Sequence, residues 1–304
     1  MQRDQLSTLR ADVLERARSA FAHMDEISEQ NTKKVLDVMR ACRVSDVHFN
    51  VSAGYAYSDL GREKLDEVYA RVFGAERALV RTQFVSGTHA LAAVLFGLLR
   101  PGDRLVSITG TPYDTMQTVI GWAHESCGSL KEFGVSYDEL PLREGHVDLD
   151  SIAHVMTPET KIALVQRSRG YSEREPLSIA DIRAVSARIK AANPNCIVFV
   201  DNCYGEFVET EEPTAIADVD IMAGSLIKNP GGGLAPTGGY IAGRSDLVEM
   251  ASYRLTAPGM GDELGASLVS NRLLFQGLFL APHVVAQALK GAVFAAGIFE
   301  GLGC

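Results

Sequence analysis

Short runs of apolar residues alternate with helix-like segments along most of this chain, and this alternation constrains its fold more than any other feature. The runs are Ala78–Val80, Leu105–Ile108, Lys161–Val165, Cys196–Val200, Ile221–Ala223 and Tyr240–Ala242. Strands that alternate with helices typically form a largely parallel sheet with helices on both faces. In such sheets ligands bind at the carboxyl ends of the strands. The residues that directly follow each run are therefore the first candidates for a functional site.

Several segments carry helix signals. Apolar residues from 65 to 73 recur at helical spacing, and Gly74 is expected to end that helix. Ser178–Ala192 begins with the S-x-x-D pattern of a capping box and is followed by Asn-Pro, which stops a helix. The first forty residues predict an arm of two amphipathic helices, with Asn31 as a candidate cap of the second.

The composition argues against several classes of protein. A net charge of −9 disfavours nucleic acid or an anionic membrane as the main partner. Five cysteines without a CxxC pair and scattered histidines disfavour a disulfide framework or a metal site. The N-terminus lacks a signal-peptide core, and the longest uncharged stretch, 273–289, is interrupted by polar residues and proline, so we expect it to fall short of a membrane span. We therefore expect a cytoplasmic protein.

The first two strand ends carry residues with two interpretations each. Ser86-Gly87-Thr88 opens an apolar helix. Small residues at a helix start leave backbone N–H groups and the positive end of the dipole free to bind phosphate. A plain helix cap made by Ser86 or Thr88 is the alternative. Tyr113 follows the second run, where it either stacks on a planar ligand or fills a turn as a buried aromatic side chain.

The later strand ends carry an acid and a lysine. Asp201-Asn202 ends a fully apolar strand, and a carboxylate in such dry surroundings needs a partner, either a cap or salt bridge or a cationic ligand. Lys228 follows the next buried strand, three positions after Ser225, where lysine is rare unless it is paired or reactive. A nucleophilic lysine needs surroundings that lower its pKa. A lysine that reaches a loop carbonyl is the alternative.

Together these side chains fit pyridoxal phosphate. We expect the Lys228 amine to bind its aldehyde, Asp201 to pair with its pyridine nitrogen and Tyr113 to stack on its ring, and these three are the candidate catalytic residues. The helix start at residues 86–88, together with Ser225, is expected to hold the phosphate. The candidate cofactor-binding residues of this site are Ser86, Gly87, Thr88, Tyr113, Asp201, Asn202, Ser225 and Lys228.

Longer motifs extend this interpretation to a family. They are GYAYSDLGR at 54–62, VSGTHA at 85–90, QRSRGY at 166–171, FVDNCYGEF at 199–207 and GSLIKNPGGGLAPTGG at 224–239. With them the chain, over nearly its whole length, resembles the aluminium-resistance, or methionine γ-lyase-like, family of fold-type I pyridoxal-phosphate enzymes, which are related to cystathionine β- and γ-lyases.

The resemblance implies a domain plan. A helical arm (1–60) is expected to precede a cofactor-binding large α/β domain of the aspartate aminotransferase type (61–265). Residues 266–304 are expected to form C-terminal helices that lead to a small domain, which is expected to be missing because the chain is truncated.

The resemblance also implies an activity. The expected reaction is a carbon–sulfur lyase reaction, by β- or γ-elimination, on a sulfur amino acid such as cystathionine or methionine. An aminotransferase on the same fold is one alternative. A non-catalytic pyridoxal-phosphate-binding protein without a complete substrate site is the other.

Four further residues enter through the resemblance. Tyr57 (or Tyr55) and Arg62 are expected to reach the cofactor phosphate of a neighbouring subunit, which implies a homodimer or homotetramer with shared active sites. Arg167 and Arg169 are candidates for binding the substrate carboxylate, since arginine binds carboxylates with two parallel hydrogen bonds. Surface salt bridges are the alternative for both arginines.

Overall fold

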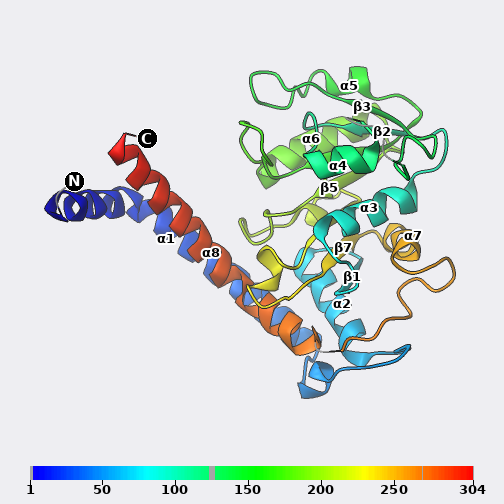
Figure 1. Cartoon of the computed structure of the whole chain (residues 1–304), viewed down its shortest axis with the longest axis horizontal. Helices are drawn as coiled ribbons and strands as arrows, with labels where there is room; N and C mark the ends of the chain where they lie inside the picture. Colours follow the sequence, from blue (N-terminus) through cyan, green and yellow to red (C-terminus); the bar gives the residue numbers. More distant parts are fainter. Residues whose placement is uncertain (1–2, 123–126, 269, 304) are drawn as a thin grey trace.

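A seven-stranded sheet of order β1-β7-β6-β5-β4-β2-β3 forms the centre of the molecule (Figure 1). The computed structural model describes residues 3–122, 127–268 and 270–303. The strands are β1 (Arg77–Arg81), β2 (Arg104–Ser107), β3 (Ser136–Glu139), β4 (Thr160–Gln166), β5 (Ile197–Asp201), β6 (Ile221–Ser225) and β7 (Gly239–Gly243). Six of them coincide with the apolar runs of the sequence. The edge strand β3 was not predicted because its alternating residues are exposed rather than apolar.

The sheet is mostly parallel, which confirms the predicted fold class. Pairing is parallel from β3 through β2, β4 and β5 to β6. Only β7 runs the other way, antiparallel to both β6 and β1. The carboxyl ends of β1, β2, β4, β5 and β6 therefore meet at one edge of the sheet, where the predicted site residues are collected.

Helices cover both faces of the sheet. They are α1 (Arg3–Ala41), α2 (Leu60–Phe73), α3 (Gly87–Leu98), α4 (Asp114–Ile120), α5 (Ile152–Val155), α6 (Ile179–Ala192), α7 (Ser245–Leu255) and α8 (Ser270–Leu302). Because successive strand residues face opposite sides, Val198 packs in the core shared with α2, α6 and α8, while its neighbour Ile197 packs in the core shared with α3, α4 and α7. The predicted ends hold: Gly74 caps α2 with φ 69°, and Ser178 and Asp181 form the capping box of α6.

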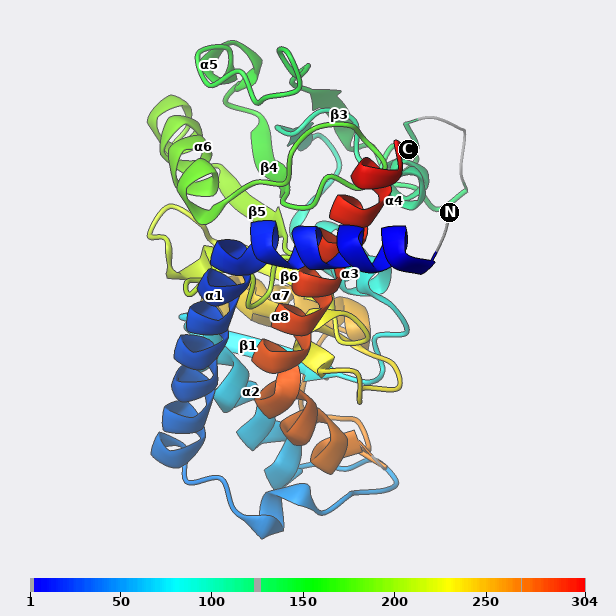
Figure 2. The same ribbon diagram turned by 90° about the vertical axis from the view of Figure 1, so that its left-hand side faces the viewer.

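The N-terminal arm differs from its prediction. It is one continuous helix, α1, because Arg3–Ala41 contains neither glycine nor proline, and it changes direction along its length (Figure 2). Asn31 does not cap a helix; it lies in mid-helix, fully buried. Its Nδ2 donates hydrogen bonds to the carbonyl oxygens of Phe207 (3.3 Å) and Glu209 (3.0 Å), so the arm is fixed to the loop that follows β5.

The C-terminal region is a single long helix, α8, that lies along α1 and projects with it from the body (Figure 1). Lys290 of α8 forms an ion pair with Asp25 of α1 at 2.5 Å. Pro282 lies inside α8 without ending it. By length and composition alone α8 is apolar enough to cross a membrane, with a mean hydropathy of 1.4 over its best window. The helix continues beyond the uncharged residues 273–289 on both sides, and the prediction that this stretch falls short of a span stays a prediction.

The predicted domain boundaries stay predictions. Residues 1, 2, 269 and 304, which belong to the predicted arm and C-terminal region, lie outside the described residues.

Candidate active site

A cavity of about 440 Å³ lies at the carboxyl edge of the sheet and brings together most of the predicted cofactor-binding residues. We call it the Lys228 cavity. The predicted residues that line it are Ser86, Gly87, Thr88, Tyr113, Asp201, Ser225 and Lys228. Its walls come from the segments after β1, β2, β4, β5 and β6, as parallel-sheet topology requires.

The start of α3 forms one wall of the Lys228 cavity. The Ser86 side chain caps the helix by accepting a hydrogen bond from the His89 N–H at 3.1 Å, so the cap interpretation is confirmed. No acidic side chain occupies the first turn of α3. A Cβ on Gly87 would lie 2.9 Å from the Ser225 Cβ and 3.3 Å from the Cys203 Sγ, so glycine allows the helix to begin directly against β6. Within the described ranges the buried Ser225 Oγ has no hydrogen-bond partner.

Asp201 supplies a buried carboxylate at the end of β5. Its Oδ1 accepts a hydrogen bond from the Cys203 N–H at 3.1 Å. Burial raises the pKa of Asp201 above its usual value, although the Cys203 hydrogen bonds and the charge of Lys228 act in the opposite direction. A cation brought into the cavity would stabilise the ionised carboxylate.

Lys228 lines the cavity, and its Nζ lies 4.0 Å from the centre of the Tyr204 ring. Burial lowers the pKa of Lys228, but Cys203, Tyr204 and Asp201 together raise it above its usual value. Burial also raises the pKa of the Cys203 thiol well above its usual value, so this thiol is neutral at pH 7. The lowered pKa that a nucleophilic role of Lys228 requires is therefore not produced by these surroundings alone, and that role stays a prediction.

Tyr113 lies between the start of α3 and Asp201. Its hydroxyl is 3.3 Å from the Thr88 Oγ1, and its backbone N–H donates to the Gln166 Oε1 at 3.3 Å. Burial, followed by the charge of Asp201, raises the pKa of its hydroxyl, which is therefore protonated at neutral pH. The half-buried ring lines the cavity, where it is available to a planar ligand.

Asn202 corrects one prediction. It follows Asp201 in the chain and faces away from the cavity, because successive residues of an extended chain point to opposite sides. The fully buried side chain donates hydrogen bonds from Nδ2 to the Glu212 Oε2 (3.0 Å) and the Tyr240 hydroxyl (3.3 Å). Its role is to satisfy a buried polar network behind the site rather than to bind a cofactor.

The structure also corrects the prediction that Arg167 binds the substrate carboxylate. Its guanidinium is buried and donates to the Asn202 Oδ1 at 2.9 Å and the Glu209 Oε2 at 2.6 Å, and it lies 3.6 Å from Glu212. These contacts neutralise it within the protein, so it is not free to bind a substrate carboxylate. Arg169 is exposed and lines a neighbouring cavity, and its predicted role stays a prediction.

The structure does not bring Tyr57 or Arg62 into the Lys228 cavity. Tyr57 is 64% exposed, so its predicted contact with a neighbouring subunit stays a prediction. Arg62 is only 4% exposed, and its guanidinium donates to the carbonyl oxygens of Ala56, Gly265 and Glu263. These hydrogen bonds hold its own chain together, and its predicted contact with the cofactor phosphate of a neighbouring subunit stays a prediction.

Sequence reasoning missed part of the cavity wall. The missed lining residues are Asp114, Thr115, Ser168, Gly170, Tyr171, Cys203, Tyr204 and Ile227. For Cys203 and Tyr204 the sequence did offer a signal, because they follow Asp201 by two and three residues. Tyr204 also has a left-handed backbone (φ 70°), which is unusual for a bulky residue and occurs often at functional sites.

In the described ranges no group of three or more His, Cys, Asp or Glu side chains is placed to hold a metal ion.

The sequence matches the family described as methionine gamma-lyase over residues 6–304, and the chain belongs to this family. It is 52% identical over 282 residues to the uncharacterised protein YnbB of Bacillus subtilis, covering 92% of this chain and 67% of YnbB. It is 28% identical over 239 residues to the L-methionine gamma-lyase of Pseudomonas putida, covering 79% of this chain and 51% of that enzyme. The chain thus spans two thirds to one half of the length of these relatives. The family predicted from the sequence motifs is confirmed.

Comparison with solved structures supports the same family and fold. A protein from Listeria monocytogenes, provisionally named a cystathionine beta-lyase involved in aluminium resistance, is 52% identical, with a TM-score of 0.95, and the match covers 98% of this chain and 73% of that one. The pyridoxal-5'-phosphate-dependent protein YhfS of Escherichia coli is 20% identical, with a TM-score of 0.62, over 86% of this chain and 66% of that one. At this identity the second match shows a shared fold alone.

Proposed function

We propose that this chain is a pyridoxal-phosphate-dependent carbon–sulfur lyase that acts on a sulfur amino acid such as cystathionine or methionine. The observation that carries the proposal is that Lys228 and Asp201 line one cavity whose wall includes the start of α3. Membership of the methionine gamma-lyase family supports the reaction class.

The residues of the Lys228 cavity fit this cofactor. A phosphate needs hydrogen-bond donors with no acid beside them. The first turn of α3 has no acidic side chain, and it lies next to the Ser225 hydroxyl, for which the described part of the chain offers no partner. A pyridine nitrogen needs a carboxylate in dry surroundings, and Asp201 is buried. An aldehyde needs an amine, which Lys228 supplies. The half-buried ring of Tyr113 would lie against the pyridine ring.

When bound, pyridoxal phosphate withdraws electrons from the bonds at the Cα of an attached amino acid. Lys228 Nζ would then be free to take up the proton of that Cα, a task for which it must be neutral. Burial already favours the neutral amine, and Asp201 opposes it. Pairing Asp201 with a cation therefore lowers the pKa of Lys228 toward the working range of a general base.

The remaining features of the proposal concern the whole protein. We propose a homodimer or homotetramer, supported by the exposed Tyr57 on the segment before α2, and a cytoplasmic location, supported by the free cysteines Cys42, Cys127, Cys196 and Cys203. Neither nucleic acid nor a membrane is proposed as a partner.

The cofactor is tested by absorbance spectra of the purified protein before and after borohydride, followed by peptide mapping. A reduced adduct on Lys228 is expected, and Lys228→Ala should carry none. An adduct on another lysine, or a protein without a cofactor spectrum, would refute the assignment.

The reaction is tested by incubation with L-cystathionine or L-methionine. Pyruvate or 2-oxobutyrate released without an acceptor supports a lyase. Strict dependence on a keto acid would instead indicate an aminotransferase. A yellow protein whose spectrum no amino acid changes would indicate a non-catalytic binding protein.

A further inference from the structure

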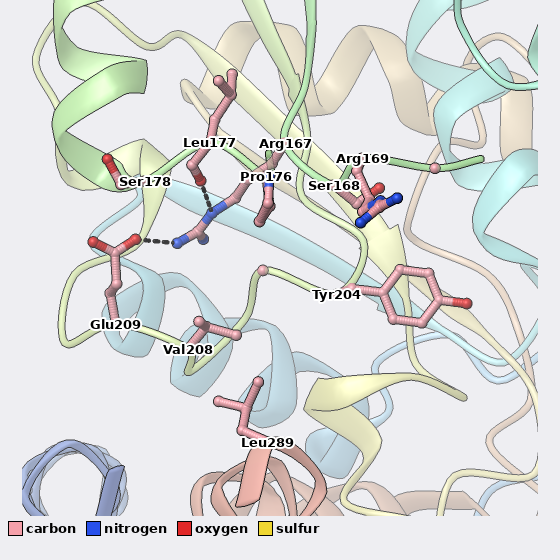
Figure 3. Close-up of a pocket in the computed structure, with 12 residues that line it drawn as sticks. Arg167, Ser168, Arg169, Pro176, Leu177, Ser178, Tyr204, Val208, Glu209 and Leu289 are labelled. Atoms are coloured by element: carbon pink, nitrogen blue, oxygen red, sulfur yellow. Dashed lines mark hydrogen bonds and ion pairs between the residues drawn. The ribbon is translucent and has the colours of Figure 1, made fainter. Parts of the chain in front are cut away.

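A second cavity of about 480 Å³ adjoins the Lys228 cavity, and we call it the Arg169 cavity (Figure 3). It lies between the segment after β4, the loop after β5 and α8. Ser168, Gly170 and Tyr204 line both cavities, so the two are neighbours that share these residues as a wall. A substrate that reaches from Lys228 into the Arg169 cavity would extend past Tyr204.

The Arg169 cavity combines apolar walls with one available cation. Four apolar side chains form much of its lining: Pro176, Leu177, Val208 and Leu289. Arg167 also lines it, but its charge is matched by Glu209, toward which it points (Figure 3). Arg169 lies on the opposite side, near Tyr204; in the part of the chain that the structure describes it forms no ion pair with a carboxylate, and its Nε donates to the Ser172 carbonyl at 2.9 Å.

We propose that the Arg169 cavity binds the leaving group of the substrate, a thiol on a short apolar stem that ends in a carboxylate held by Arg169. This inference rests on the proposed lyase function. Arg169 lines only this cavity and not the Lys228 cavity. The carboxylate it binds is therefore not the one beside the reacting amine but the one at the far end of the substrate. Apolar walls suit the stem, and a guanidinium suits its acid.

The proposal names a substrate class. It favours sulfur amino acids whose departing thiol carries an acidic group, as in cystathionine, over those whose departing thiol is a plain alkyl chain, as in methionine. Arg169 is then a specificity residue, and its loss should affect the first class alone.

The test uses two substrates that differ at one group. S-(3-carboxypropyl)-L-cysteine has the acid, and S-butyl-L-cysteine has a methyl group in its place. In the full-length enzyme with its cofactor, Arg169→Gln should lower kcat/KM for the first by about 10- to 100-fold and leave the second within about twofold. Arg188→Gln is the matched control, since Arg188 is an exposed arginine of α6, 3.8 Å from Asp150, that lines neither cavity. Equal losses for both substrates, or no loss for either, would overturn the proposal.

A binding measurement separates this proposal from the lyase function. 4-(Ethylthio)butanoate carries the same stem and acid as S-(3-carboxypropyl)-L-cysteine but no amine, so it cannot react at Lys228. Titration calorimetry should detect its binding to the parent protein and not to Arg169→Gln. Absent or unchanged binding overturns the proposal even if the enzyme eliminates thiols. Binding that depends on Arg169 in a protein without lyase activity upholds the cavity assignment and refutes the lyase instead.

Discussion

Glu206 offers a quantitative test of the buried network behind the site. It lies in the loop after β5, fully buried, where its Oε1 accepts a hydrogen bond from the Tyr240 hydroxyl at 2.7 Å, and its Oε2 has no partner among the residues that the structure describes. Burial raises its pKa to about 8, although the Tyr240 hydrogen bond acts in the opposite direction. The folded protein therefore holds this acid in its neutral form at pH 7, whereas the unfolded chain releases the proton.

The sign of the pH dependence follows from that difference. A carboxyl whose pKa is higher in the folded state favours folding fully below its unfolded pKa of 4.5 and loses this contribution as the pH rises to about 8. Each pH unit in that window costs about 1.4 kcal/mol, so Glu206 lowers the free energy of unfolding by roughly 3 kcal/mol at pH 7. Glu206→Gln is neutral at every pH and should escape this loss. At pH 4.5 the free energy of unfolding of Glu206→Gln should lie within about 1 kcal/mol of the parent value, because one N–H of the new side-chain amide lacks an acceptor.

The assay is urea unfolding followed by circular dichroism at half-unit intervals from pH 5 to pH 8.5. The gap in unfolding free energy between Glu206→Gln and the parent should widen with pH and level off above pH 8. The control is Glu211→Gln, since Glu211 is an exposed glutamate paired with Arg183 at 2.9 Å. Parallel curves for parent and variant, or a gap that widens toward acid pH, would show that Glu206 is not a neutral acid in the folded protein.

Three further substitutions test the site. Asp201→Asn should reduce turnover by at least about 100-fold with a much smaller change in cofactor affinity, measured by spectral titration, and should lower the pKa of Lys228. Gly87→Ala places a methyl 2.9 Å from the Ser225 Cβ and should cost about 1–3 kcal/mol in urea unfolding while weakening cofactor binding; unchanged affinity would count against a phosphate site there. Arg167→Met removes the cation beside the buried Glu212 and the half-buried Glu209 and should cost about 3–5 kcal/mol, whereas a loss below about 1 kcal/mol would place it among ordinary surface ion pairs.

The fold was largely predictable because its information is local. Six strands are apolar runs that must be buried, and Gly74 and Ser178 end or begin helices through their own backbone and side-chain chemistry. The edge strand β3 was not predictable in the same way, since its alternating residues are exposed. Asn31 was misjudged because a buried amide in mid-helix is explained by carbonyl groups about 180 residues away.

The site was predictable as far as topology determines it. Strand order places the end of β5 beside the end of β6, and that brings Asp201 into the same cavity as Lys228. Side-chain direction is set by finer geometry. Asn202 and Arg167 have suitable chemistry and position in the chain, but they point into the protein and satisfy one another. The pKa of Lys228 depends on the groups that surround its amine in the folded chain, which the sequence does not place.

The contact between Asn31 and the loop after β5 has a practical consequence for anyone preparing the protein. Deleting the first helix as a dispensable extension would expose two carbonyl groups of the segment that leads back to Cys203 and Tyr204. A shortened version without this helix should therefore lose order at the reaction centre even if its sheet still folds. Affinity tags are better appended ahead of Met1 than substituted for the arm.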